Sequence, residues 1–115
     1  MKEENVILDK SYSFALRIMD LAKEIREKRE YDMASQLWCS GTSIGSNVEE
    51  AQAAQSRADF RSKMAIASKE ARETHYWLRL ALDGGILPNA LLAEAINEIE
   101  AIKRILTSIV KSSGQ

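Results

Sequence analysis

The feature that most constrains the fold is a helical hydrophobic period that runs through most of the chain. Its clearest stretch lies near the C-terminus, where apolar residues return in steps of three and four at Leu92, Ala95, Ile99, Ile102, Leu106 and Ile109. This spacing places them on one face of a helix. The 115 residues include only one Pro and five Gly, so little interrupts helices and the composition disfavours strands. The chain is predicted to be all-α.

Capping and turn residues divide the chain into four segments. Asp9, Asp32 and Ser56 are candidate N-caps, because their side chains can accept from a free backbone N–H. The pair Gly84-Gly85 can end a helix, and Pro88 suits a first turn. The predicted helices cover residues 9–28, 32–55, 57–83 and 89–111. Short connections favour an up-down antiparallel four-helix bundle, with residues 1–115 as a single domain.

The first predicted helix has more apolar surface than one bundle core requires. Its main line is predicted to be Tyr12, Ala15, Leu16, Met19, Ala22 and Ile25, and Phe14, Ile18 and Leu21 widen it. A wide apolar surface indicates contacts on two sides. We therefore expect self-association through a shared apolar face.

Gly41 and Gly45 lie in the middle of the second predicted helix. Gly in a helix interior costs about 1 kcal/mol relative to Ala, so a loop that splits the segment is one interpretation. We favour a continuous helix, because Ile44 and Val48 maintain the apolar period. Two Gly one turn apart would then let another helix approach closely.

Charge and cysteine content limit the class of protein. There are 16 basic and 17 acidic residues, whereas a dedicated nucleic-acid binder usually shows a basic excess. An assembly could still gather charge on one face. Cys39 is the only cysteine, which excludes an intrachain disulfide and fits a reducing compartment. No signal core or membrane-length apolar run is present, so we expect a cytoplasmic protein without membrane association.

No set of residues predicts catalysis, a metal or a cofactor. A di-metal bundle needs Glu-x-x-His pairs, but the only histidine is His75 and Arg72 stands three residues before it. One Cys and one His make a poor zinc site. A nucleophilic Cys39 would need a base such as His75 nearby, and a small core thiol is the preferred interpretation. The segment from Gly41 lacks the Gly-Lys-Ser/Thr of a phosphate loop.

Polar residues beside the apolar stripes form a second group of candidates. Ser43, Asn47 and Glu50 recur at helical spacing, and Lys63, Glu70 and Thr74 show related spacing further on, with Lys69, Arg72 and Glu73 alongside. Three interpretations remain: a binding patch, a network that fixes helix register or a subunit contact, or solvated faces. Any inward Glu should have a basic or hydroxyl partner, because buried charges are costly unless paired.

Aromatic and basic residues suggest contact with RNA as an alternative. Trp38, Tyr76 and Trp77 could stack on bases, although aromatics at helical spacing are more often core or interface anchors. The third predicted helix has a basic bias that Asp59, Glu70 and Glu73 interrupt. Its candidate RNA contacts are Arg57, Arg61 and Arg72.

Two segments resemble the signatures of a known family. The first runs from Gly41 to Ala51, and the second joins Ser56–Phe60 to Lys63–Leu78. Together they resemble the bacterial four-helix bundle proteins encoded in intervening sequences of 23S ribosomal RNA genes. The accessory proteins of diversity-generating retroelements are similar. The resemblance is dense over residues 38–85.

The resemblance implies a four-helix bundle, a ring-shaped homopentamer and no known catalysis. The family role is unsettled, and the retroelement accessory proteins act with a reverse transcriptase and nucleic acid. The function predicted is a non-enzymatic oligomeric scaffold that binds another macromolecule, and the alternative is an RNA- or ribonucleoprotein-associated accessory protein. The positions implied to be structural or assembly residues are Ser43, Ile44, Asn47, Glu50, Asp59, Phe60, Lys69, Glu70, Glu73, Tyr76 and Trp77.

Overall fold

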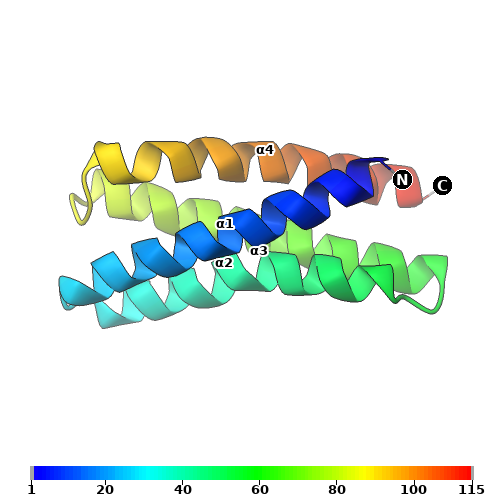
Figure 1. Ribbon diagram of the computed structural model, residues 1–115, viewed down its shortest axis with the longest axis horizontal. Helices are drawn as coiled ribbons and strands as arrows, with labels where there is room; N and C mark the ends of the chain where they lie inside the picture. Colours follow the sequence, from blue (N-terminus) through cyan, green and yellow to red (C-terminus); the bar gives the residue numbers. More distant parts are fainter. Residues whose placement is uncertain (1, 115) are drawn as a thin grey trace.

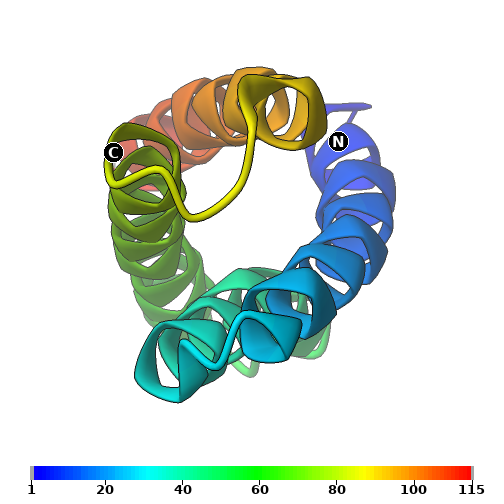
Figure 2. The same cartoon turned by 90° about the vertical axis from the view of Figure 1, so that its left-hand side faces the viewer.

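The computed structural model describes residues 2–114, apart from the side chains of Glu3 and Glu4, and contains four long helices over that range. They are α1 (Lys2–Glu27), α2 (Tyr31–Gln52), α3 (Arg57–Asp83) and α4 (Asn89–Ser113). Each helix runs antiparallel to the one before it, and α4 closes the bundle against α1 (Figure 1). The end view shows the four helices surrounding one core (Figure 2). The all-α up-down bundle predicted from the sequence is confirmed.

The helix starts were predicted with mixed success. Ser56 caps α3, where its hydroxyl accepts from the Asp59 N–H at 3.0 Å. The Asp9 cap is wrong, because α1 already begins at Lys2 and the fully buried Ile7 extends its core face. Asp32 is also not a cap: it lies in the first turn of α2, where a carboxylate favours the helix dipole.

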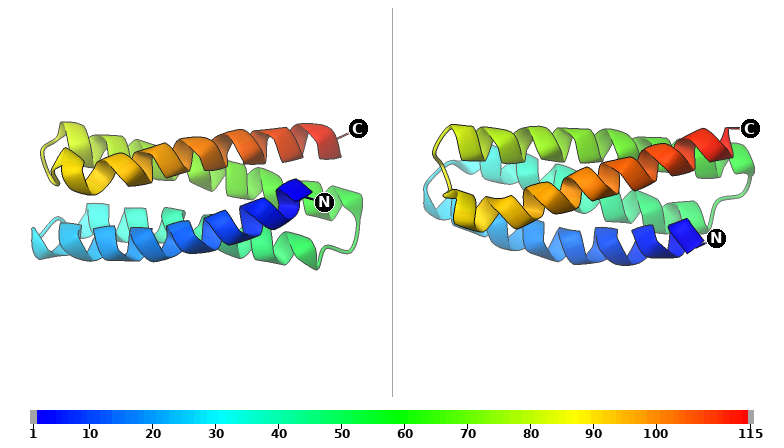
Figure 3. Two further views of the ribbon diagram at one scale, coloured as in Figure 1. Left: turned by 45° about the horizontal axis from the view of Figure 1, so that its top comes forward. Right: turned by 90° about the horizontal axis from the view of Figure 1, so that it is seen from above.

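The helix ends differ from prediction by a few residues. The helix α2 stops at Gln52 instead of residue 55, because Ala53 and Ala54 donate three residues back, to Glu50 and Ala51. The end of α3 is as predicted, and Gly85 adopts a φ of 71°, which glycine tolerates without strain. Both chain ends lie at the same end of the bundle (Figure 3).

The apolar line predicted for α4 faces the bundle axis. The line predicted for α1 does so only in part. All six residues of the predicted α4 line are buried. In α1 the core face is instead formed by Ile7, Phe14, Ile18, Leu21, Ala22 and Ile25. Tyr12 and Leu16, predicted to be in the main line, are 64% and 50% exposed. The helix therefore carries two apolar stripes, one inside the bundle and one on its surface.

The helix α2 is continuous through Gly41 and Gly45, as favoured from the period. A Cβ on Gly41 would lie 2.5 Å from Cγ2 of Ile18 on α1. The absence of a side chain thus permits the close packing of α1 against α2 at this level.

Candidate functional site

The two signature segments lie on adjacent antiparallel helices, α2 and α3, and meet along one seam. At its buried centre, Thr74 Oγ1 hydrogen bonds to Ser40 Oγ at 3.0 Å. Thr74 was among the polar candidates, whereas Ser40 was not. The signal for Ser40 was available: it lies three residues after Leu37 and four before Ile44, both on the buried line of α2.

The α2 signature residues satisfy their polar groups within their own helix. The Ser43 hydroxyl donates to the carbonyl of Cys39 at 2.5 Å, and the Asn47 amide donates to the carbonyl of Ser43 at 2.8 Å. Such bonds to the residue four positions earlier occupy groups that could otherwise face a ligand. Ile44 is a fully buried core residue, and Glu50 is exposed.

Asp59 and Phe60 belong to the start of α3. The Asp59 carboxylate accepts from the backbone N–H of Gln55 at 3.3 Å and lies 3.7 Å from the Lys63 ammonium. Phe60 is half-buried and packs against the core. Both residues stabilise the α2–α3 turn and the first turn of α3.

Glu70 is the α3 signature residue with the clearest electrostatic perturbation. Lys69 and Glu73 are exposed, whereas Glu70 is half-buried. Burial raises the pKa of Glu70, the neighbouring carboxylate of Glu73 raises it further, and Lys69 partly opposes both. The position of Glu70 therefore disfavours the charged form of its carboxyl group.

Tyr76 and Trp77 form a contact of their own. Their ring centroids are 5.3 Å apart and their planes cross at 71°, an edge-to-face arrangement that aromatic rings favour. Trp77 packs against the core, and its buried Nε1 has no hydrogen-bond partner among the described residues. Tyr76 is 47% exposed.

The three candidate RNA contacts on α3 are exposed but do not act alike. Arg61 donates from Nε to the carbonyl of Val110 on α4 at 3.3 Å, so it also joins the two helices. Arg57 lies one turn before Arg61, and Arg72 lies three turns beyond it. They therefore extend along α3 without forming one compact cluster.

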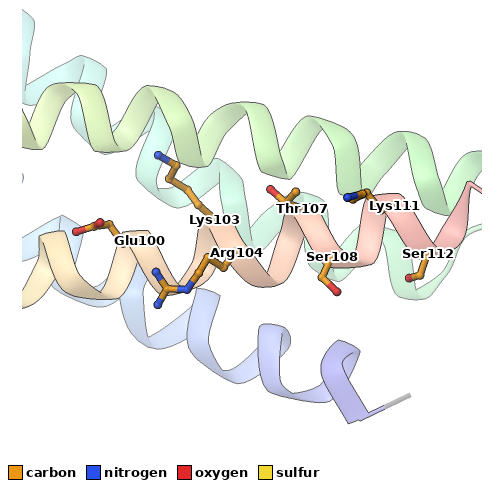
Figure 4. A pocket seen from close by; sticks show the side chains of 7 residues that line it. All are labelled: Glu100, Lys103, Arg104, Thr107, Ser108, Lys111 and Ser112. Atoms are coloured by element: carbon orange, nitrogen blue, oxygen red, sulfur yellow. The ribbon is translucent and has the colours of Figure 1, made fainter.

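A second basic region was not among the candidates predicted from the sequence. An open groove of about 700 Å³ on α4 is lined by Glu100, Lys103, Arg104, Thr107, Ser108, Lys111 and Ser112 (Figure 4). Lys103 Nζ lies 3.1 Å from Nδ1 of His75 on α3. The candidate RNA contacts predicted from the sequence lay on α3 and did not include these α4 cations. Charge is concentrated here, since the described residues that line the groove include three basic residues and one acid.

Cys39 is not a core residue. It is exposed, so the preferred interpretation of a core thiol is wrong. Together with Trp38 it lines a small groove of about 260 Å³ between α1 and α2. Within the described part of the chain, no group of three or more His, Cys, Asp or Glu could hold a metal ion, and no helix is long and apolar enough to cross a membrane.

Fold and surface together define a small helical bundle whose signature residues mainly pack and cap its helices. The chain matches the family described as 23S rRNA-intervening sequence protein over residues 3–108, and it belongs to that family. It is similar to the crystal structure of a protein with unknown function from the S23 ribosomal protein family of Bacteroides thetaiotaomicron. The two are 44% identical with a TM-score of 0.89, over 95% of this chain and 98% of that one. No curated protein matches it.

Proposed function

We propose that this protein is a non-enzymatic scaffold that associates with further copies of itself, five by resemblance, and presents the assembly to a macromolecular partner. The observation that carries the proposal is the second apolar stripe of α1. Tyr12, Leu16 and Met19 follow one another at helical spacing on the outside of the bundle, where Tyr12 and Leu16 are 64% and 50% exposed. Covering such side chains contributes about 25 cal/mol per Å² of apolar surface removed from water.

The neighbouring helices offer surfaces that a second copy could cover. On α2, Tyr31 and Trp38 are exposed, and on α3, Ile66 and Leu80 are exposed. The helix α3 does not pack against α1, so Ile66 and Leu80 lie apart from the α1 stripe, whereas Tyr31 and Trp38 lie on the side of α2 next to Arg26 of α1. Two different surfaces on one chain favour head-to-tail contacts, which form a ring when the rotation between successive copies closes.

A role without catalysis is part of the same proposal. Ser40, Ser43, Asn47 and Thr74 of the α2–α3 seam bond within their helices or to each other. We also propose that the protein works in the cytoplasm. The exposed single thiol of Cys39 fits a reducing compartment.

Native mass spectrometry at micromolar concentration tests the assembly. The expected mass is five times the 12.9 kDa of the chain. The double substitution Tyr12→Glu/Leu16→Glu should release monomers, because it places charge on the proposed contact. Lys10→Glu, which changes the charge by the same two units, is the matched control, since Lys10 is exposed on the side of α1 next to Glu98 and Ile102 of α4. A monomeric unmodified protein would contradict the proposal.

The second candidate function is an RNA- or ribonucleoprotein-associated accessory role. The observation that favours it is the basic groove on α4. Measurable binding of a labelled RNA at low salt, weakening as salt rises, is the expected result.

A further inference from the structure

The groove on α4 is organised in two rows along the helix axis. Figure 4 shows Lys103, Thr107 and Lys111 on the side toward α3, and Arg104, Ser108 and Ser112 along the other side. Members of a row are four residues apart, which corresponds to about 6 Å along the axis. The groove is thus long enough for several consecutive anionic groups.

The facing surface of α3 adds further positive charge. Lys103 and Arg79 both lower the pKa of His75, after the larger effect of burial, and Glu100 partly opposes them. Both cations therefore lie close enough to His75 to act on it, on either side of the α3–α4 seam. Among the described residues, Glu100 is the only acid that lines the groove.

One exposed aromatic ring lies among the α3 cations. Arg72, Tyr76 and Arg79 are spaced at i, i+4 and i+7, so they share one face of α3. Tyr76 is 47% exposed, and its ring makes an edge-to-face contact with the ring of Trp77. A half-exposed ring on a helix face that also carries two arginines is suited to stacking on a base.

We infer that this α3–α4 surface binds a single-stranded nucleic acid, with phosphates along Lys103, Arg104 and Lys111 and a base stacked on Tyr76. The alternation of cations with an aromatic ring favours a strand with unpaired bases over an inorganic anion or a lipid surface, neither of which offers a base to stack. A duplex keeps its bases stacked on each other. The inference deepens the RNA-associated candidate function and does not depend on self-association.

The test is fluorescence anisotropy of a short labelled single-stranded RNA with the full-length protein. The combined variant Lys103→Gln/Arg104→Gln/Lys111→Gln should weaken binding at low salt at least tenfold. The slope of the logarithm of the association constant against the logarithm of the salt concentration should also become less steep by about 2. Each of the three lost phosphate contacts contributes about 0.7 to that slope. The charge-matched control is Lys10→Gln/Lys23→Gln/Lys28→Gln, three exposed positions on and just after α1, and it should bind like the unmodified protein.

The stacking contact has its own pair of variants. Tyr76→Ala should weaken binding about tenfold, whereas Tyr76→Phe should retain it, because the ring and not the hydroxyl makes the contact. Native mass spectrometry of the same samples separates the two roles of this residue. A Tyr76→Ala protein that loses its assembly would assign Tyr76 to a subunit contact and overturn the stacking role.

His75 gives an independent reading of occupancy. A phosphate beside Lys103 and Arg79 would offset their charge, so the imidazole NMR signals of His75 should move on titration with RNA. In the variant Lys103→Gln/Arg104→Gln/Lys111→Gln, the same signals should not move when RNA is added.

Three results would overturn the inference, in different ways. RNA binding that both triple variants weaken equally would place the strand elsewhere and leave the RNA-associated function standing. Full competition by inorganic polyphosphate, with no effect of Tyr76→Ala, would reduce the groove to a general anion site. No RNA binding at low salt would remove both the groove and the RNA-associated function, while the scaffold proposal would stand on its own measurement.

Discussion

The side chain of Ile18 on α1 fills the space directly opposite Gly41 on α2. A Cβ on Gly41 would lie 2.5 Å from Cγ2 and 2.8 Å from Cγ1 of Ile18, which is well inside contact distance. Ile18 is fully buried, so its side chain cannot move into solvent. The packing distance between α1 and α2 at this level depends on glycine.

Gly41→Ala is therefore expected to destabilise the fold. Overpacking a core costs about 1–3 kcal/mol, and most of this range exceeds the gain of about 1 kcal/mol from replacing Gly by Ala in a helix. Gly45→Ala is the matched control, because its Cβ would lie 3.4 Å from the carbonyl oxygen of Ser11, at ordinary contact distance. It should be neutral or slightly stabilising in urea unfolding. Equal effects of the two substitutions would show that the approach of Ile18 is not limiting.

The same pair of residues explains what the sequence could and could not predict. Local signals were sufficient for the α4 core line, for the Ser56 cap and for the continuity of α2. In α1, both Leu16 and Ile18 belong to apolar stripes, and periodicity does not decide which stripe faces inward. That choice depends on the partner helix, since Ile18 fits against Gly41.

For the candidate surfaces, too, the sequence could predict local contacts but not contacts between helices. The bonds of Ser43 and Asn47 run to residues four positions earlier, so helical spacing alone could suggest them. The contact between His75 and Lys103 joins residues 28 positions apart, and it requires the register of α3 against α4. The residues lining the α4 groove recur along one helix, so the sequence contained that signal, and only their placement beside His75 requires the register.

Loss of the hydroxyl contact between Ser40 and Thr74 should destabilise the α2–α3 seam. Thr74→Val keeps the shape of the side chain, leaves the Ser40 hydroxyl near the carbonyl of Leu37 at 3.5 Å, and should cost about 1 kcal/mol. Ser40→Ala should cost a similar amount. Urea unfolding of both single variants and the double variant gives the coupling energy. Strictly additive effects would mean that the two hydroxyls do not interact.

Glu70→Gln should stabilise the protein at neutral pH. The pKa of Glu70 is raised above 4.5 by burial and by Glu73, so the folded state disfavours the charged carboxylate. The contribution of Glu70 to stability is therefore largest below pH 4.5 and is lost as the pH rises through its folded pKa. Because the group is partly solvated, the expected gain from Gln is small, about 0.5 kcal/mol.

Thermal unfolding at two pH values checks the sign of the Glu70 effect. The difference between Glu70→Gln and the unmodified protein should shrink at pH 4, where the carboxyl group is largely protonated. Glu49→Gln, an exposed position on α2, is the control for a general charge effect. If Glu49→Gln stabilised the protein and Glu70→Gln did not, the result would contradict the assignment to Glu70.

His75 should make the stability of the protein depend on pH below neutrality. Burial lowers its pKa below 6.5, Lys103 and Arg79 lower it further, and Glu100 partly offsets them. The unfolded chain then binds the proton more readily, so stability is complete above pH 6.5 and decreases as the pH falls toward the folded pKa. His75→Gln, which keeps an acceptor for Lys103, should remove this part of the pH dependence.

Because His75 is the only histidine, NMR titration of its ring reads the pKa directly. Lys103→Gln should raise that pKa, whereas a value at or above 6.5 in the unmodified protein would show that burial and the two cations do not act on the ring.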